Sequence, residues 1–217
     1  MRIGVLLSGC GIGDGSQIEE VILTYLALDK YKVDYICIAP NKKQFHTVNH
    51  LDEQIEPKEE RNVLIESARI GRGKIRALDH IHVEELDGLI IPGGIGLFKN
   101  LSNYVMDKEQ FVLDEQVDTL IKCMHQSQKP IGAMCGGIVL LARCLGSTEG
   151  PLNLCTSHGA YKQLLEMNHI IVEELEADEI LVDTYHKIVT TPAFLGTQDL
   201  YKMMGGVDKL VKALLTL

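Results

Sequence analysis

Short apolar runs alternate along the chain with longer segments in which apolar and polar residues follow a helical period. Runs rich in valine, isoleucine and leucine are typical of parallel strands buried on both faces. They predict strands at 3–7, 33–39, 88–91, 131–134 and 187–190. The amphipathic segments between them predict helices at 17–29, 62–70, 114–126, 138–145, 160–167 and 198–215. The alternation predicts an α/β fold with a mostly parallel central sheet covered by helices on both faces.

Two features modify this pattern. The glycine pair Gly205-Gly206 leaves open that the last segment forms two helices. The stretch 41–78 is polar, charged and less periodic, so we expect an insertion beside the sheet. No repeat or linker composition divides the chain. We therefore expect a single domain over residues 1–217.

Composition narrows the classes of partner. The net charge of −9 disfavours nucleic acids and anionic membranes, because both are bound through clustered lysine and arginine. We expect a small-molecule ligand instead. No apolar run approaches the ~20 residues of a membrane span, and the segment before Cys10 is too short for a signal peptide. We therefore expect a cytoplasmic protein.

The cysteines and histidines show no metal-site pattern. Six cysteines include no C-x-x-C pair, which favours reduced thiols that are mostly buried. The pairs His46 and His50, and His80 and His82, have spacings that a metal could use, but no cysteine or carboxylate cluster completes a ligand set. We expect no metal.

One cysteine stands at a turn with the spacing of a nucleophile elbow. Cys135 follows a predicted strand, precedes a helix and has small neighbours, including Gly136 and Gly137. At a helix N-terminus, unpaired N–H groups favour the thiolate, so we expect the pKa of Cys135 below its ordinary ~8.5. The alternative is a buried cysteine at a tight turn.

Two further loops should meet Cys135, because the carboxyl ends of parallel strands share one edge of the sheet. The consecutive glycines Gly93 and Gly94 can direct backbone N–H groups at an oxyanion, as can Gly136; a plain glycine turn is the alternative. Cys10 follows the first strand and is expected to line the pocket, or to serve packing. Asn100 is expected to bind substrate, or to lie on a surface loop.

The elbow, the Pro-Gly-Gly loop and the order of elements resemble the ThiJ/PfpI superfamily, relatives of class I glutamine amidotransferases. The chain is most similar to the ElbB (enhancing lycopene biosynthesis) branch. The matching blocks are 3–16, 61–78, 92–103, 187–193 and 207–211. This resemblance implies a flavodoxin-like three-layer sandwich, usually a homodimer, with cysteine chemistry that needs no cofactor.

The resemblance also implies partners for Cys135. Its carboxylate position falls on Glu19, which must be protonated and donate a hydrogen bond to sulfur, since a charged carboxylate would repel a thiolate. Glu20 is the neighbour that a helix turn does not place on the same face. The alternative is that both acidic residues stabilise the helix dipole. His158 falls where many members carry the histidine that works beside the cysteine, although some ElbB-like proteins lack it.

These residues imply a glyoxalase-like enzyme that converts glyoxal or methylglyoxal to the hydroxy acid without glutathione. Glutamine hydrolysis is not expected, because Thr190-Thr191-Pro192-Ala193 stands where amidotransferases carry a His-x-Glu pair. The alternatives are a redox-sensing or stress-protection protein that uses the same oxidisable thiol, and a weak hydrolase. The joint presence of Glu19 and His158 favours catalysis, since sensing needs only the thiolate.

Overall fold

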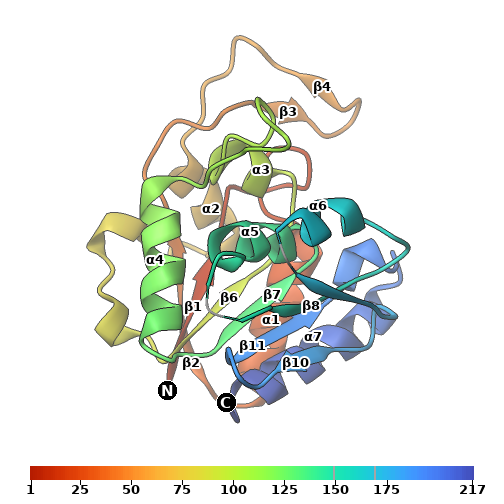
Figure 1. Ribbon diagram of the computed structural model, residues 1–217. Helices are drawn as coiled ribbons and strands as arrows, with labels where there is room; N and C mark the ends of the chain where they lie inside the picture. The colour runs from red at the N-terminus through yellow and green to blue at the C-terminus, as the bar shows by residue number, and fades with distance from the viewer. Residues whose placement is uncertain (149, 169) are drawn as a thin grey trace.

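A twisted, mostly parallel sheet forms the centre of the computed structural model, which describes residues 1–148, 150–168 and 170–217 (Figure 1). Within these residues the sheet has seven strands in the order β10-β11-β7-β6-β1-β2-β5. They are β1 (Arg2–Leu6), β2 (Asp34–Ala39), β5 (Ile75–Ala77), β6 (Gly88–Ile91), β7 (Ile131–Met134), β10 (Leu181–Asp183) and β11 (Ile188–Thr191). β10 and β11 pair antiparallel, and the other neighbours pair parallel.

Helices cover both faces of the sheet. They are α1 (Ile18–Lys30), α2 (Val63–Ile70), α3 (Gly96–Asn100), α4 (Glu115–Gln126), α5 (Gly136–Leu145), α6 (Lys162–Met167) and α7 (Leu200–Leu214). The core divides accordingly into a cluster with α1, α2 and α7 and a cluster with α3 to α6. Successive strand residues alternate between them: Leu89 and Ile91 join the second cluster and Ile90 the first. The three-layer sandwich expected from the sequence is confirmed.

The predicted strands and helices are observed with ends shifted by at most two residues, and α7 is a single helix. Its glycine pair does not end it, because the second glycine permits a close approach. A Cβ on Gly206 would lie 2.2 Å from the Ala177 carbonyl oxygen and 2.5 Å from Thr191 Oγ1. Among the described residues, no helix is long and apolar enough to cross a membrane.

The segment 41–78 is only partly separate from the sheet. The short pair β3 (Val48–Asn49) and β4 (Gln54–Ile55) lies outside it, at the top of Figure 1, whereas α2 and β5 complete one edge of the sheet. A second small pair, β8 (Asn153–Thr156) and β9 (Ile171–Glu174), flanks α6. The sequence pattern predicts none of these short strands, since two to four residues are too few to establish a period.

Candidate active site

Cys135 occupies a sharp turn between β7 and α5. Its backbone lies at φ +50° and ψ −127°, a conformation that costs energy for a residue other than glycine. The helix that follows packs tightly against the neighbouring strand: a Cβ on Gly137 would lie 2.3 Å from the Ile91 carbonyl oxygen. The small residues after Cys135 therefore bring the helix N-terminus against the sheet and hold the sulfur at the strand end.

The glycine loop after β6 surrounds the sulfur. Backbone N–H groups of Gly136 and Gly94 donate to the Cys135 sulfur. A Cβ on Gly93 would lie 2.8 Å from that sulfur and 2.8 Å from Glu20 Oε2, so only glycine fits between them. The three glycines expected near an oxyanion are thus at the thiol.

The carboxyl group that contacts Cys135 belongs to Glu20, so the assignment to Glu19 is wrong by one residue. Glu20 is fully buried, whereas Glu19 is exposed. Helix α1 begins at Ile18, and the Gln17 side chain caps it by accepting the Glu19 N–H at 3.0 Å. Successive helical residues point ~100° apart, so this starting point turns Glu20 toward the sheet. The order of residues alone does not determine which of two adjacent carboxylates faces inward.

Three groups hold the Glu20 carboxyl. The Gly93 N–H donates to Oε2 at 2.6 Å, the Phe194 N–H donates to Oε1 at 3.1 Å, and a side-chain hydrogen bond joins the carboxyl to Cys135. The Phe194 donor directly follows the segment 190–193, in which the amidotransferase His-x-Glu pair is absent. Ala193 has φ +50°, which aims the N–H of Phe194 at the carboxyl. Burial, opposed by these bonds, raises the pKa of Glu20 to about 7.

The pKa of Cys135 is raised well above its ordinary value, which contradicts the lowered pKa expected from the helix N-terminus. Burial is the largest cause, followed by the charge of Glu20. The N–H groups of Gly136 and Gly94 act in the expected direction but are outweighed. Near pH 7 the resting site therefore holds a neutral thiol beside a carboxyl group that is close to half ionised.

His158 does not join this pair. It lies exposed in the turn between β8 and α6 at φ +50°. No hydrogen bond between described residues links it to Cys135. The expectation is wrong because the tight turn at 157–160 directs the side chain to solvent. The sequence pattern does not single out Tyr161, the last residue of this turn. Burial, followed by the charge of Cys135, raises the pKa of Tyr161 to about 12.

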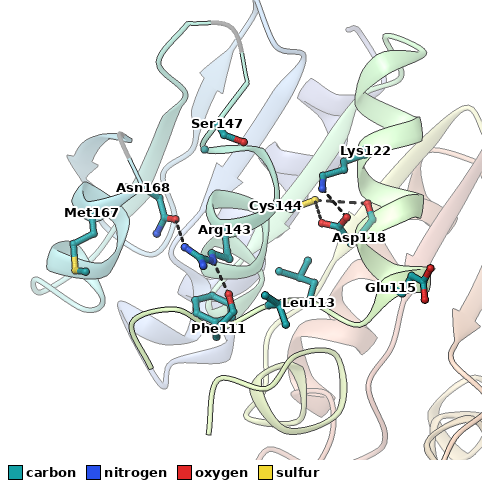
Figure 2. Close-up of a pocket in the computed structure, with 12 residues that line it drawn as sticks. Phe111, Leu113, Glu115, Asp118, Lys122, Arg143, Cys144, Ser147, Met167 and Asn168 are labelled. Atoms are coloured by element: carbon teal, nitrogen blue, oxygen red, sulfur yellow. Dashed lines mark hydrogen bonds and ion pairs between the residues drawn. The ribbon is translucent and has the colours of Figure 1, made fainter. Parts of the chain in front are cut away.

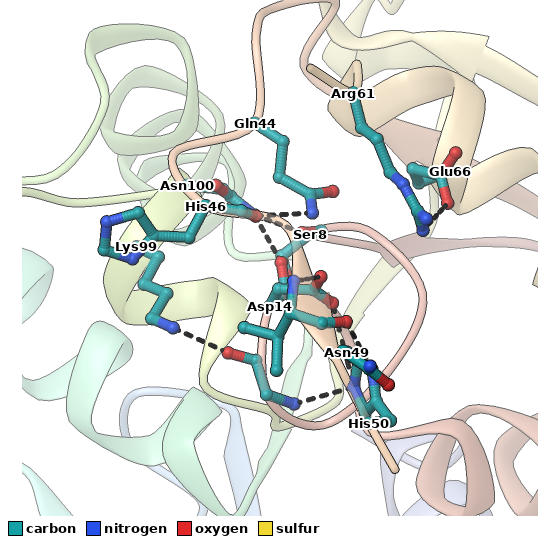
Figure 3. A network of polar contacts seen from close by, with 12 residues as sticks. Ser8, Asp14, Gln44, His46, Asn49, His50, Arg61, Glu66, Lys99 and Asn100 are labelled. Atoms are coloured by element: carbon teal, nitrogen blue, oxygen red, sulfur yellow. Dashed lines mark hydrogen bonds and ion pairs between the residues drawn. The ribbon is translucent and has the colours of Figure 1, made fainter. Parts of the chain in front are cut away.

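Asn100 holds the loop at 8–16 rather than facing a substrate (Figure 3). Its Nδ2 donates to the carbonyl oxygens of Ser8 and Asp14, both at 2.8 Å, and its Oδ1 accepts the Phe45 N–H at 2.9 Å. The side chain is buried, with all of these groups engaged. The prediction that Asn100 binds substrate is therefore wrong, because its amide is fully used by backbone groups.

Cys10 packs against the core cluster of α1, α2 and α7. Its thiol is half-buried, and the charged groups around it are Glu66 and Arg69 of α2, Asp14 and Arg61. Figure 3 shows Arg61 reaching Glu66 beside the same loop. These contacts agree with the packing role given as the alternative for Cys10, and its place in the pocket of the nucleophile stays a prediction.

A second thiol lines a cavity of about 620 Å³ between α4, α5 and the end of α6 (Figure 2). Cys144 Sγ donates to Asp118 Oδ1 at 3.3 Å, and Lys122 pairs with the same carboxylate at 2.6 Å. Burial raises the pKa of Cys144 strongly. Among the residues that the structure describes, Cys144 has no backbone N–H donors of the kind that Gly136 and Gly94 provide to Cys135. Over the described ranges, no group of three or more His, Cys, Asp or Glu side chains could hold a metal ion.

Comparisons with family models, curated proteins and solved structures point to the same family. The model of the DJ-1/PfpI family matches residues 11–198. The human glutamine amidotransferase-like class 1 domain-containing protein 3, mitochondrial, is 35% identical over 225 residues, covering 100% of this chain and 83% of that protein. The rat ES1 protein homolog, mitochondrial, is 33% identical over 225 residues, with coverage of 100% and 84%.

Among solved structures, an isoprenoid biosynthesis protein with an amidotransferase-like domain from Ehrlichia chaffeensis superposes with a TM-score of 0.93. It is 30% identical and covers 100% of this chain and 98% of its own. The curated relatives are mitochondrial proteins, which contradicts the cytoplasmic location expected from the sequence. That expectation considered apolar segments, whereas mitochondrial transit peptides are amphipathic.

Proposed function

Because the chain belongs to the DJ-1/PfpI family, we propose that it is a cofactor-free enzyme that converts glyoxal or methylglyoxal into the hydroxy acid through Cys135. The family includes glyoxalase-like members. Within it, the chain is proposed to be ElbB-like, on the sequence blocks and the likeness to the Ehrlichia protein. The observation that carries the proposal is the hydrogen-bonded pair of Cys135 and Glu20, whose carboxyl has a pKa of about 7.

The first step joins sulfur to the aldehyde carbon. Ionised Glu20 accepts the thiol proton as the Cys135 sulfur attacks, so no free thiolate has to form before the attack. The carbonyl bond opens, its oxygen gains the electron pair, and the proton passes to that oxygen to give a hemithioacetal. The N–H groups of Gly94 and Gly136, which meet at the sulfur, are placed to stabilise the oxyanion.

The second step moves a proton between the two carbons of the former dicarbonyl. Glu20 removes the proton from the carbon bonded to sulfur and returns one to the neighbouring carbon, through an enediol. The product is a thioester of a 2-hydroxy acid. Water then cleaves the carbon–sulfur bond, which releases the acid and restores the thiol. A carboxyl group with a pKa of about 7 suits both directions of transfer near neutral pH.

Substitution of the nucleophile tests the proposal. We expect Cys135→Ala to lose at least about 100-fold of the rate of glyoxal and methylglyoxal consumption, because no other group forms the covalent adduct. Cys123→Ser, a half-buried thiol on α4, is the matched control and should retain the parent rate. Hydroxy acid formation is measured by chromatography alongside dicarbonyl loss. Equal rates for Cys135→Ala and the parent protein would contradict the proposal.

A further inference from the structure

An aromatic cluster stands beside the elbow. Phe98 of α3 contacts the first residue of α5: a Cβ on Gly136 would lie 3.2 Å from its ring. Two tyrosines pack on the same phenylalanine. The Tyr104 ring centroid lies 4.7 Å from that of Phe98, and the Tyr161 centroid lies 5.6 Å from it. Phe98 therefore connects both phenols to the turn that carries Cys135.

Tyr161 has a strained backbone conformation. Tyr161 immediately precedes α6 at φ +57° and ψ 9°, a left-handed conformation that is uncommon for an aromatic residue. Burial is the largest cause of the raised pKa of the phenol and charge on Cys135 is the next, so the sulfur lies within electrostatic range of Tyr161. Strain of this kind persists where the surrounding structure requires one side-chain direction.

The hydroxyl of Tyr161 is not used by the fold. Within the described residues, no hydrogen bond joins it to another protein group, although the ring is half-buried. Tyr161 and Tyr104 also line a cavity of about 650 Å³ between the 104–109 segment and α6. A small molecule in this cavity would meet both tyrosines. Dispersion with the ring faces and the unused hydroxyl groups of the two tyrosines are available to it.

We propose that the Tyr161 hydroxyl is a further catalytic group, which donates a hydrogen bond to the carbonyl oxygen of an aldehyde bound at Cys135. This inference rests on the proposed function and assigns to Tyr161 the part that the resemblance assigned to His158. The phenol remains protonated at neutral pH, since its pKa is about 12, so it acts as a donor. It adds a side-chain donor to the backbone donors of Gly94 and Gly136.

The test measures aldehyde addition without turnover. Propionaldehyde has one carbonyl group, so it can form the hemithioacetal but cannot complete the reaction. Its binding is followed by NMR through the backbone amide signals of Gly94 and Gly136, which donate to the sulfur. We expect Tyr161→Phe to raise the dissociation constant about tenfold, the effect of one lost hydrogen bond. Tyr104→Phe, from the same cluster and cavity, is the matched control and should stay within twofold.

The outcomes separate this inference from the proposed function. Equal dissociation constants for Tyr161→Phe and the parent would overturn the role of Tyr161, whatever the glyoxal assay shows. A parent protein that gives no propionaldehyde-dependent shift would also overturn it. Tight parent binding that Tyr161→Phe weakens, without any glyoxal consumption, would support Tyr161 as an aldehyde-binding group and reject the proposed function alone. An equal rise of the dissociation constant in Tyr104→Phe would overturn the specific role of Tyr161, because the aromatic cluster would then act through packing.

Discussion

Replacement of Glu20 by glutamine should remove a specific pH dependence of stability. The folded protein raises the pKa of this carboxyl from its ordinary 4.5 to about 7, mainly through burial. A carboxyl with a raised folded pKa stabilises the fold most when it is protonated. That stability is fully present below the unfolded pKa and is lost as the pH rises through the folded pKa.

The magnitude follows from the two pKa values. Proton linkage with values of 4.5 and about 7 gives a loss of about 2.5 kcal/mol in the free energy of unfolding between pH 5 and pH 8. Glutamine does not titrate, so this loss is absent in Glu20→Gln. The variant begins at a disadvantage of about 1 to 3 kcal/mol, because both carboxyl oxygens accept backbone N–H groups and an amide nitrogen cannot. Its deficit should shrink or reverse by pH 8.

Urea unfolding at pH 5, 6, 7 and 8 measures the difference in unfolding free energy between the parent protein and each variant. Other carboxylates contribute equally to both proteins and cancel. Glu19→Gln is the matched control: its side chain is exposed on the same helix, and the variant keeps the buried carboxyl of Glu20, so its stability should fall between pH 5 and pH 8 as that of the parent does. A Glu20→Gln difference that also stays constant within about 0.5 kcal/mol would refute the raised pKa and, with it, the use of Glu20 as a base near pH 7.

Two further substitutions test assignments outside the pair. Asn100→Ala should lower the free energy of unfolding by about 3 kcal/mol in urea titration, because it leaves buried backbone groups of Ser8, Asp14 and Phe45 unpaired; a change below about 0.5 kcal/mol would contradict its structural role. Lys32→Gly should raise the melting temperature and add about 1 kcal/mol to the free energy of unfolding, because Lys32 follows the C-cap of α1 at φ +56° with the bonds of a Schellman motif. A lower melting temperature would show that the lysine side chain outweighs the backbone strain.

The sequence predicts the layers of the fold because each layer has a strong local signal. The strands β1, β2, β6, β7 and β11 are short apolar runs, and the covering helices have a clear apolar face. What the pattern does not predict is contact between distant segments. β5 joins the sheet through its register with β2, and Gly206 remains helical because it packs on Ala177.

The candidate site also combines features that follow from local sequence with features that depend on contacts between distant segments. The turn at Cys135 and the glycines around it follow from residue type and spacing, since a sharp turn beside a strand requires small neighbours. Its partners are set by tertiary geometry. Whether Glu19 or Glu20 faces inward depends on where α1 begins, and the exposure of His158 depends on the left-handed turn before α6. The spacing of residues in the sequence predicts neither of these side-chain orientations.

The protonation of the Cys135–Glu20 pair also distinguishes a catalytic thiol from a redox-sensing thiol. A sensor needs a thiolate that is exposed to peroxide in the resting protein. Here the cysteine is 8% exposed, and burial together with the Glu20 charge keeps its proton on sulfur. The charge available at neutral pH lies on the carboxyl of the coupled pair. A thiolate then forms only while Glu20 accepts the proton and a carbonyl carbon accepts the sulfur electron pair. That requirement favours an electrophile bound against the pair, and it leaves peroxide in solution facing a neutral, nearly inaccessible thiol.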